Sequence, residues 1–174
     1  MNALGRTVAG ALFAGLALGS SCDPVYDNQV AALGGEAAGV RHGPLHRPGQ
    51  PCLLCHDGAL GNPSAFSVAG TVYKDPAPAA ATPAGGVEVT MTNVSDGKSY
   101  TATTNAVGNF YVLPAQWTPV YPFTVTVRGG AQKACMTSHV GRDGSCAACH
   151  VEPAGRASPG RVTLTSDQTN GGCP

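Results

Sequence analysis

The chain has 174 residues, enough for one domain of ordinary size or for one small domain with appendages. Charged residues make up 11% of it and the formal net charge is zero, which excludes a basic field for nucleic acid and an acidic tail. Aromatic residues, at 6%, are too few for a densely packed aromatic core, whereas 24 glycines and 14 prolines favour turns, extended segments and short strands.

The N-terminus has the pattern of an export signal. Arg6 supplies a positive charge, an apolar run follows over 8–18, and small residues lead to Cys22. The run is too short for a stable membrane anchor. The stretch resembles a bacterial lipobox, although the usual Leu three residues before the Cys is Gly19 here. We therefore expect a signal peptide over 1–21 and acylation of Cys22; the alternative is plain secretion, with Cys22 left as an ordinary thiol.

Residues 22–65 are expected to be irregular. Pairs of glycine and proline interrupt the segment repeatedly, and at most 28–33 suits a turn or two of helix. Two histidines, His42 and His46, come just before a Cys-x-x-Cys-His motif made of Cys52, Cys55 and His56. Such a glycine-rich lead-in would be ordered if it wrapped a large apolar group.

Residues 66–130 change to a period of two, which is typical of half-buried strands. Polar and apolar side chains alternate in short runs, and turn residues such as Asp96 and Gly97 separate the runs. This spacing predicts an antiparallel β-sandwich. The expected strands lie at 66–73, 87–92, 98–104, 110–113, 123–128 and 161–165.

Four stretches of this region match a known module. They read Val-Ala-Gly-Thr-Val, Gly-Val-Glu-Val, Thr-Asn-Ala-Val-Gly-Asn-Phe and Tyr-Pro-Phe-Thr-Val-Thr-Val, at 68–72, 86–89, 104–110 and 121–127. By them, 66–130 resembles the transthyretin-like sandwich in the form seen in carboxypeptidase regulatory-like domains. That family is mostly structural or adhesive and has no catalytic residues of its own, so none carry over. Another small sandwich is the alternative.

Residues 131–174 are expected to be irregular apart from the last strand, and they contain a second Cys-x-x-Cys-His motif. Its members are Cys146, Cys149 and His150. Since the termini of a sandwich can lie near one another, we expect both motif-bearing flanks to form one lobe on the β-domain. The predicted fold is thus mainly β, a small antiparallel sandwich with irregular N- and C-terminal flanks.

Cys-x-x-Cys-His is the attachment signature of c-type haem, and this chain has it twice. In each copy the two thiols form thioethers with the porphyrin, and the His is the proximal iron ligand. The sequence therefore predicts two haem c groups. The covalent anchors are Cys52, Cys55, Cys146 and Cys149, and the proximal ligands are His56 and His150.

The distal side of each iron needs a second donor, usually His or Met in electron carriers. His46 lies six residues before Cys52, and His139 lies seven residues before Cys146. Tethers this short make it hard for either His to reach the far face of its own haem, so we expect an exchange, with each His bound to the other haem. His42 is the alternative to His46. A further candidate is Met136, whereas Met91 is expected in the core.

Cysteine arithmetic leaves two thiols over. Four belong to the motifs and Cys22 to lipid, so that Cys135 and Cys173 remain. An oxidising compartment favours a disulfide between them; the alternative is that both stay reduced.

Together these features predict an electron carrier in the bacterial periplasm or cell envelope. Its partners would be other envelope redox proteins and, through acylated Cys22, the lipid bilayer; no small-molecule substrate and no nucleic acid is expected. One alternative is a small dihaem peroxidase, although the chain is short and has no assignable distal acid/base. Another is a surface lipoprotein whose sandwich binds a partner, with the motifs binding zinc or forming disulfides, although about 90 residues separate the two Cys pairs.

Overall fold

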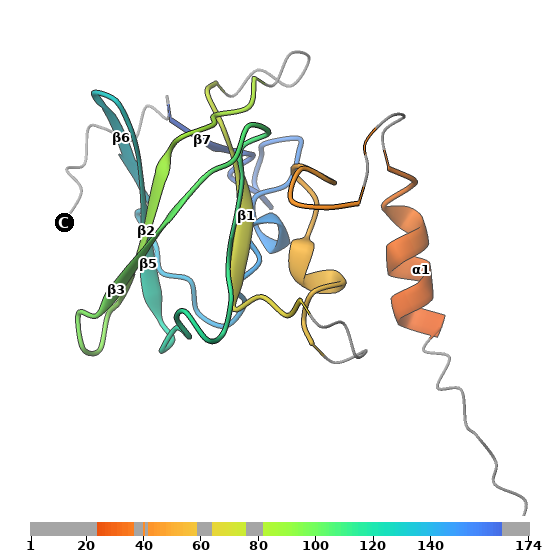
Figure 1. The fold of residues 1–174 in the computed structure, drawn as a ribbon, viewed down its shortest axis with the longest axis horizontal. Coiled ribbons are helices and arrows are strands. Elements are labelled where there is room, and N and C mark those ends of the chain that lie inside the picture. The colour runs from red at the N-terminus through yellow and green to blue at the C-terminus, as the bar shows by residue number, and fades with distance from the viewer. Residues whose placement is uncertain (1–23, 37–39, 41, 59–63, 76–81, 165–174) are drawn as a thin grey trace, which may run out of the picture.

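Two β-sheets face each other in the computed structural model, which describes residues 24–36, 40, 42–58, 64–75 and 82–164 (Figure 1). A three-stranded sheet has the order β4–β1–β7, and a four-stranded sheet has the order β3–β2–β5–β6. The strands are β1 (Val68–Tyr73), β2 (Glu88–Asn93), β3 (Ser99–Thr103), β4 (Asn109–Val112), β5 (Phe123–Gly129), β6 (Gln132–Cys135) and β7 (Val162–Thr163). The predicted signal peptide, Cys22 and Cys173 lie outside the described residues.

All six predicted strands are present, and the register follows their alternation. In the four-stranded sheet, β2 runs antiparallel to β3 and β5, with Met91 opposite Val125. In the other sheet, β1 pairs antiparallel with β4 and parallel with β7. One strand, β6, was not predicted, because its sequence Gln-Lys-Ala-Cys has no apolar alternation. It pairs antiparallel with the edge of β5.

The hydrophobic core lies between the two sheets. Val68 and Phe110 come from the three-stranded sheet, and Met91, Phe123 and Val127 come from the other. All five are almost completely buried. The prediction of a mainly β sandwich, with Met91 in its core, is confirmed.

Helix α1 (Pro24–Ala32) begins four residues earlier than the segment expected to be helical. Proline suits the first helical position because its missing N–H would be unsatisfied there, and Asp27 in the first turn complements the helix dipole. The helix reaches the first motif through Tyr26, whose side chain hydrogen-bonds Cys55, a contact that raises the pKa of Tyr26. In the described ranges, no helix has the length and apolarity needed to cross a membrane.

The motif-bearing parts of both flanks pack against β1 and form one lobe, as predicted, whereas β6 of the C-terminal flank joins β5. On the N-terminal side, the Gly49 N–H donates to Oγ1 of Thr71 at 2.8 Å, and the Asn109 amide donates to the His46 carbonyl at 2.9 Å. On the C-terminal side, Ser145 pairs with Ala69 in a parallel bridge. Figure 1 shows the gold segment with the first motif and the blue segment with the second motif beside β1.

Candidate functional site

The two Cys-x-x-Cys-His motifs adopt the same backbone turn. Each begins with one turn of 3-10 helix, η1 (Cys52–Leu54) in the first motif and η3 (Cys146–Ala148) in the second. In both, the N–H groups of the second Cys and of the His donate to the carbonyl of the first Cys. These distances are 3.2 and 3.0 Å in the first motif and 3.2 and 2.8 Å in the second. Two segments far apart in the chain thus present the same Cys, Cys and His arrangement.

The two motif histidines are oriented in the same way. Nδ1 of His56 lies 2.8 Å from the carbonyl oxygen of Ser64, and Nδ1 of His150 lies 2.8 Å from that of Gly160. A carbonyl oxygen only accepts, so Nδ1 carries a proton in each ring, and in the neutral imidazole Nε2 then has the lone pair. Metal-ligating histidines are typically held by such a bond from the other ring nitrogen. Both side chains are therefore in the tautomer that binds a metal through Nε2.

A buried hydroxyl group, that of Ser158, organises the loop that returns to His150. Its Oγ accepts hydrogen bonds from the N–H groups of Val151, at 2.9 Å, and Gly160, at 3.1 Å. The same oxygen lies 2.8 Å from the carbonyl of Cys149 and 2.6 Å from that of Val151. Ser158 thereby ties the end of the motif to the residue whose carbonyl orients His150.

Stacked aromatic rings hold the first motif instead. The ring of His56 stacks on Phe66 with 4.3 Å between centroids, and Phe66 stacks on Tyr111 of β4 at 4.7 Å. The Phe66 N–H also donates to the carbonyl of His56 at 2.8 Å. The backbone geometry of the two motifs is thus shared, while the side chains around them differ.

The two motifs are close neighbours beside β1. Cys146 packs on Gly70 of that strand, and burial of its thiol raises the pKa to about 12, with a smaller contribution from nearby Cys52. Burial also raises the pKa of Cys52. None of the four motif cysteines is in a disulfide.

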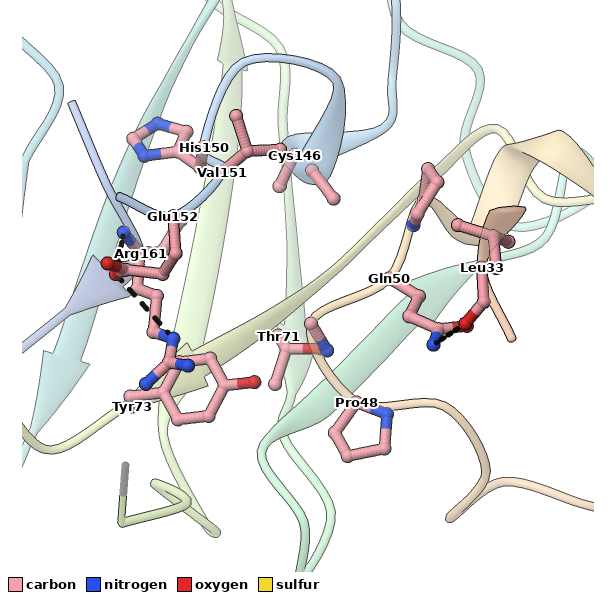
Figure 2. Close-up of a pocket in the computed structure, with 14 residues that line it drawn as sticks. Leu33, Pro48, Gln50, Thr71, Tyr73, Cys146, His150, Val151, Glu152 and Arg161 are labelled. Atoms are coloured by element: carbon pink, nitrogen blue, oxygen red, sulfur yellow. Dashed lines mark hydrogen bonds and ion pairs between the residues drawn. The ribbon is translucent and has the colours of Figure 1, made fainter. Parts of the chain in front are cut away.

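A cavity of about 310 Å³ lies between the lead-in to the first motif and the second motif (Figure 2). Its floor includes Thr71 and Tyr73 of β1. Cys146 and His150 line one side, so the second motif opens directly into it. The other lining residues are Leu33, Pro48, Gly49, Gln50, Pro51, Ala147, Val151, Glu152, Arg161 and Val162.

The predicted distal ligands lie in different surroundings. His46 is near the first motif, 5.8 Å from His56 between ring centroids, and its Nδ1 accepts the N–H of Gly43 at 3.2 Å. Accepting at Nδ1 places the proton of His46 on Nε2, the opposite tautomer to that of His56. The side chain of His42 is 96% exposed. His139 is also exposed, next to the residue that bridges to the start of β5.

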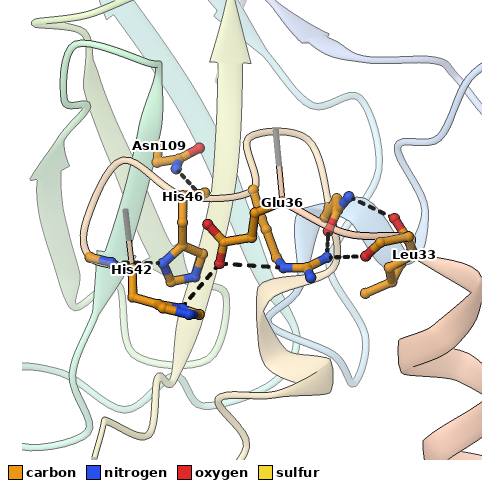
Figure 3. Close-up of polar contacts among 9 residues, drawn as sticks. Leu33, Glu36, His42, His46 and Asn109 are labelled. Carbon is orange, nitrogen blue, oxygen red and sulfur yellow. Dashed lines mark hydrogen bonds and ion pairs between the residues drawn. The ribbon is translucent and has the colours of Figure 1, made fainter. Parts of the chain in front are cut away.

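A polar cluster fastens the lead-in to the chain after α1 (Figure 3). Oε1 of Glu36 lies 3.2 Å from Nδ1 of His42 and 3.8 Å from Nε of Arg47. Arg47 also donates to the carbonyl of Gly34 and to Gln50, at 3.0 and 2.8 Å. These contacts tie Arg47 and Gln50 of the lead-in to the residues that follow α1.

The described part of the chain contains no metal site built from several protein side chains. No three His, Cys, Asp or Glu side chains converge there. The four motif cysteines thus make no shared zinc site in this structure. Cys135 is disulfide-bonded, and its predicted partner, Cys173, lies outside the described residues.

Sequence reasoning missed several residues that position the motifs, among them Ser158, Gly160 and Phe66. No local pattern marks Ser158 or Gly160, because their partners, backbone groups for Ser158 and the His150 ring for Gly160, meet them only in the folded loop. Gly70 did carry a signal, since a glycine inside a strand often marks a close approach by another group.

No protein-family model, curated protein or solved structure matches this chain. Its function is therefore inferred from the geometry of the two motifs.

Proposed function

We propose that this protein is a dihaem c-type cytochrome that carries single electrons in the bacterial cell envelope. The observation that supports this most is the repetition of one geometry at both motifs. Each has the same turn, and each His has Nδ1 on a backbone carbonyl at 2.8 Å. A structural disulfide or a surface binding module would not require this tautomer at both histidines.

Each motif residue has one role in this proposal. Cys52 and Cys55 anchor one haem, and Cys146 and Cys149 anchor the other. His56 and His150 ligate the two irons. When bound, haem supplies a one-electron iron couple, whose potential the surrounding protein tunes. The carbonyls of Ser64 and Gly160 keep each imidazole in its ligating tautomer.

Electron transfer is also favoured by the adjacency of the motifs. Both turns pack beside β1, and Cys52 lies near enough to Cys146 for its charge to raise the pKa of that thiol. Two haems attached there would be neighbours, an arrangement suited to passing electrons through the protein. The redox partner would be another envelope protein, and acylation of Cys22 would hold the cytochrome at a membrane.

The distal ligands belong to the same proposal. His46 and His139 remain the candidates, with His42 as the alternative. Ligation by Nε2 of His46 would require its Nδ1 to give up the Gly43 N–H and carry the proton itself. Replacing His46 or His139 with Ala should convert part of a low-spin spectrum to high-spin. Unchanged spectra for both variants would refute this assignment.

Expression of the full chain with a cytochrome c maturation system tests the main proposal. A red product with a pyridine haemochrome spectrum and two haems per chain is expected. The double variants Cys52→Ala/Cys55→Ala and Cys146→Ala/Cys149→Ala serve as matched controls, and each should retain one haem. A colourless wild-type protein that contains zinc by elemental analysis would overturn the proposal. Rapid turnover of hydrogen peroxide would favour a peroxidase instead.

A further inference from the structure

An ion pair between Arg161 and Glu152 lies next to the second motif in the cavity wall. Nε of Arg161 lies 3.6 Å from Oε1 of Glu152, and 22% and 28% of the surface of these two side chains is exposed. The guanidinium lies over the ring of Tyr73, 4.9 Å from its centroid. Among the described residues that line the cavity, Arg161 is the one Lys or Arg (Figure 2).

The backbone fixes this ion pair relative to His150. Glu152 follows His150 by two residues, and Arg161 directly follows Gly160, whose carbonyl holds Nδ1 of His150. The Arg161 N–H also lies 3.4 Å from Oε1 of Glu152. Both charges are thus tied at short range to the imidazole that ligates iron in the proposed function.

We propose that the cavity receives the haem attached at the second motif, and that Arg161 faces the carboxylate side chains of this haem. The inference rests on the proposed function. The planar guanidinium matches a carboxylate with two parallel hydrogen bonds, and its delocalised charge is tolerated in partly buried sites. Tyr73 holds it in place by a cation–π contact. The remaining cavity wall includes two prolines, two valines, Leu33 and Ala147, and these apolar side chains suit the faces of a porphyrin.

Arg161 would also tune the second haem. Reduction lowers the charge on the iron, so a nearby cation favours the ferrous state and a nearby anion disfavours it. Partial burial weakens screening by water and strengthens both effects. Removing Arg161 leaves Glu152 and the haem carboxylates without their cation, which lowers the midpoint potential; removing the charge of Glu152 raises it.

Spectroelectrochemical titration of the dihaem protein tests the inference. We expect Arg161→Gln to lower one of the two midpoint potentials by about 59 mV, which corresponds to about a tenfold change in the equilibrium constant for one-electron reduction. Glu152→Gln should raise the same potential. Arg161→Lys keeps the positive charge and should lower the potential less than Arg161→Gln does. The matched control is Arg156→Gln, which removes an exposed charge from the same loop and should move neither potential. The variant Cys52→Ala/Cys55→Ala, which retains only the second haem, identifies which potential moves.

The outcomes separate the two proposals. A dihaem protein in which Arg161→Gln and Glu152→Gln shift neither potential more than Arg156→Gln does would overturn this inference and leave the cytochrome intact. A shift confined to the first haem would also overturn it. A wild-type chain that attaches no haem would overturn the proposed function and this inference together. If Arg161→Gln does not fold, the sign of the Glu152→Gln shift decides.

Discussion

The side chain of Cys146 occupies the space that a side chain on Gly70 would need. A Cβ atom at Gly70 would lie 2.6 Å from Sγ of Cys146 and 2.7 Å from its Cβ. A Cβ atom does not come this close to a neighbour to which it is not bonded, so the second motif packs on β1 only because that strand has a glycine at this position. The relationship joins a strand of the sandwich to a motif 76 positions later in the chain.

Gly70→Ala should therefore displace the second motif. The added methyl group also meets Phe110 at 3.1 Å, and overpacking of this kind costs about 1–3 kcal/mol. We expect a loss of this size in urea unfolding, together with fewer haems at Cys146 and Cys149. Gly141→Ala is the control, since nothing lies within 4 Å of its added Cβ. Equal stability and haem content for the two variants would contradict the role of Gly70.

Ser158→Ala should loosen the loop that orients His150. The variant removes the acceptor of two N–H groups and the one hydroxyl proton that the carbonyls of Cys149 and Val151 share, and an unsatisfied buried group costs about 1–3 kcal/mol. The free energy of unfolding should fall by about this amount, and the spectrum of the second haem alone should change. Ser95→Ala, at an exposed turn, should stay within about 0.5 kcal/mol of wild type. A change in the first haem instead would speak against this network.

Phe66→Leu should affect only the first motif. It removes the ring contacts to His56 and Tyr111, and such pairs are worth about 0.5–1.5 kcal/mol each. With the imidazole plane less constrained, the electron paramagnetic resonance signal of the first haem should broaden. Tyr111→Phe keeps the stack and is the control. The idea fails if the two variants give the same spectrum.

The haem-free protein should lose stability in alkaline solution. Burial makes the Cys146 thiolate unfavourable in the folded chain, so its pKa rises from 9.0 to about 12, whereas the unfolded chain releases this proton near the ordinary value. The contribution is complete below about pH 9 and is lost as the pH rises towards 12, with a slope of at most about 1.4 kcal/mol per pH unit. Urea unfolding between pH 8 and about pH 10 measures this slope. Cys146→Ala should flatten it, and an unchanged slope in that variant would contradict the shift.

The sequence by itself determined the features that depend on short-range patterns. Alternation of apolar and polar residues located six strands, because side chains on a strand point to opposite faces in turn. The spacing within each Cys-x-x-Cys-His motif identified the residues that the structure then places on one turn. Segments without such a pattern could not be predicted. The strand β6 is one of them, because it forms only where the edge of β5 offers it unpaired backbone groups.

Only the tertiary structure decided how the motifs are held and what surrounds them. Local sequence does not encode that the carbonyl of Gly160 faces His150, or that Phe66 stacks on His56, because these contacts depend on where folded loops return. Nor does it tell that burial shields the thiols of Cys52 and Cys146 while Cys149 is exposed. Cys146 is shielded because β1 has a glycine beside it, while the first motif meets a stack of rings. The sequence specifies the same Cys, Cys and His groups in both motifs, and tertiary packing gives the two motifs different surroundings.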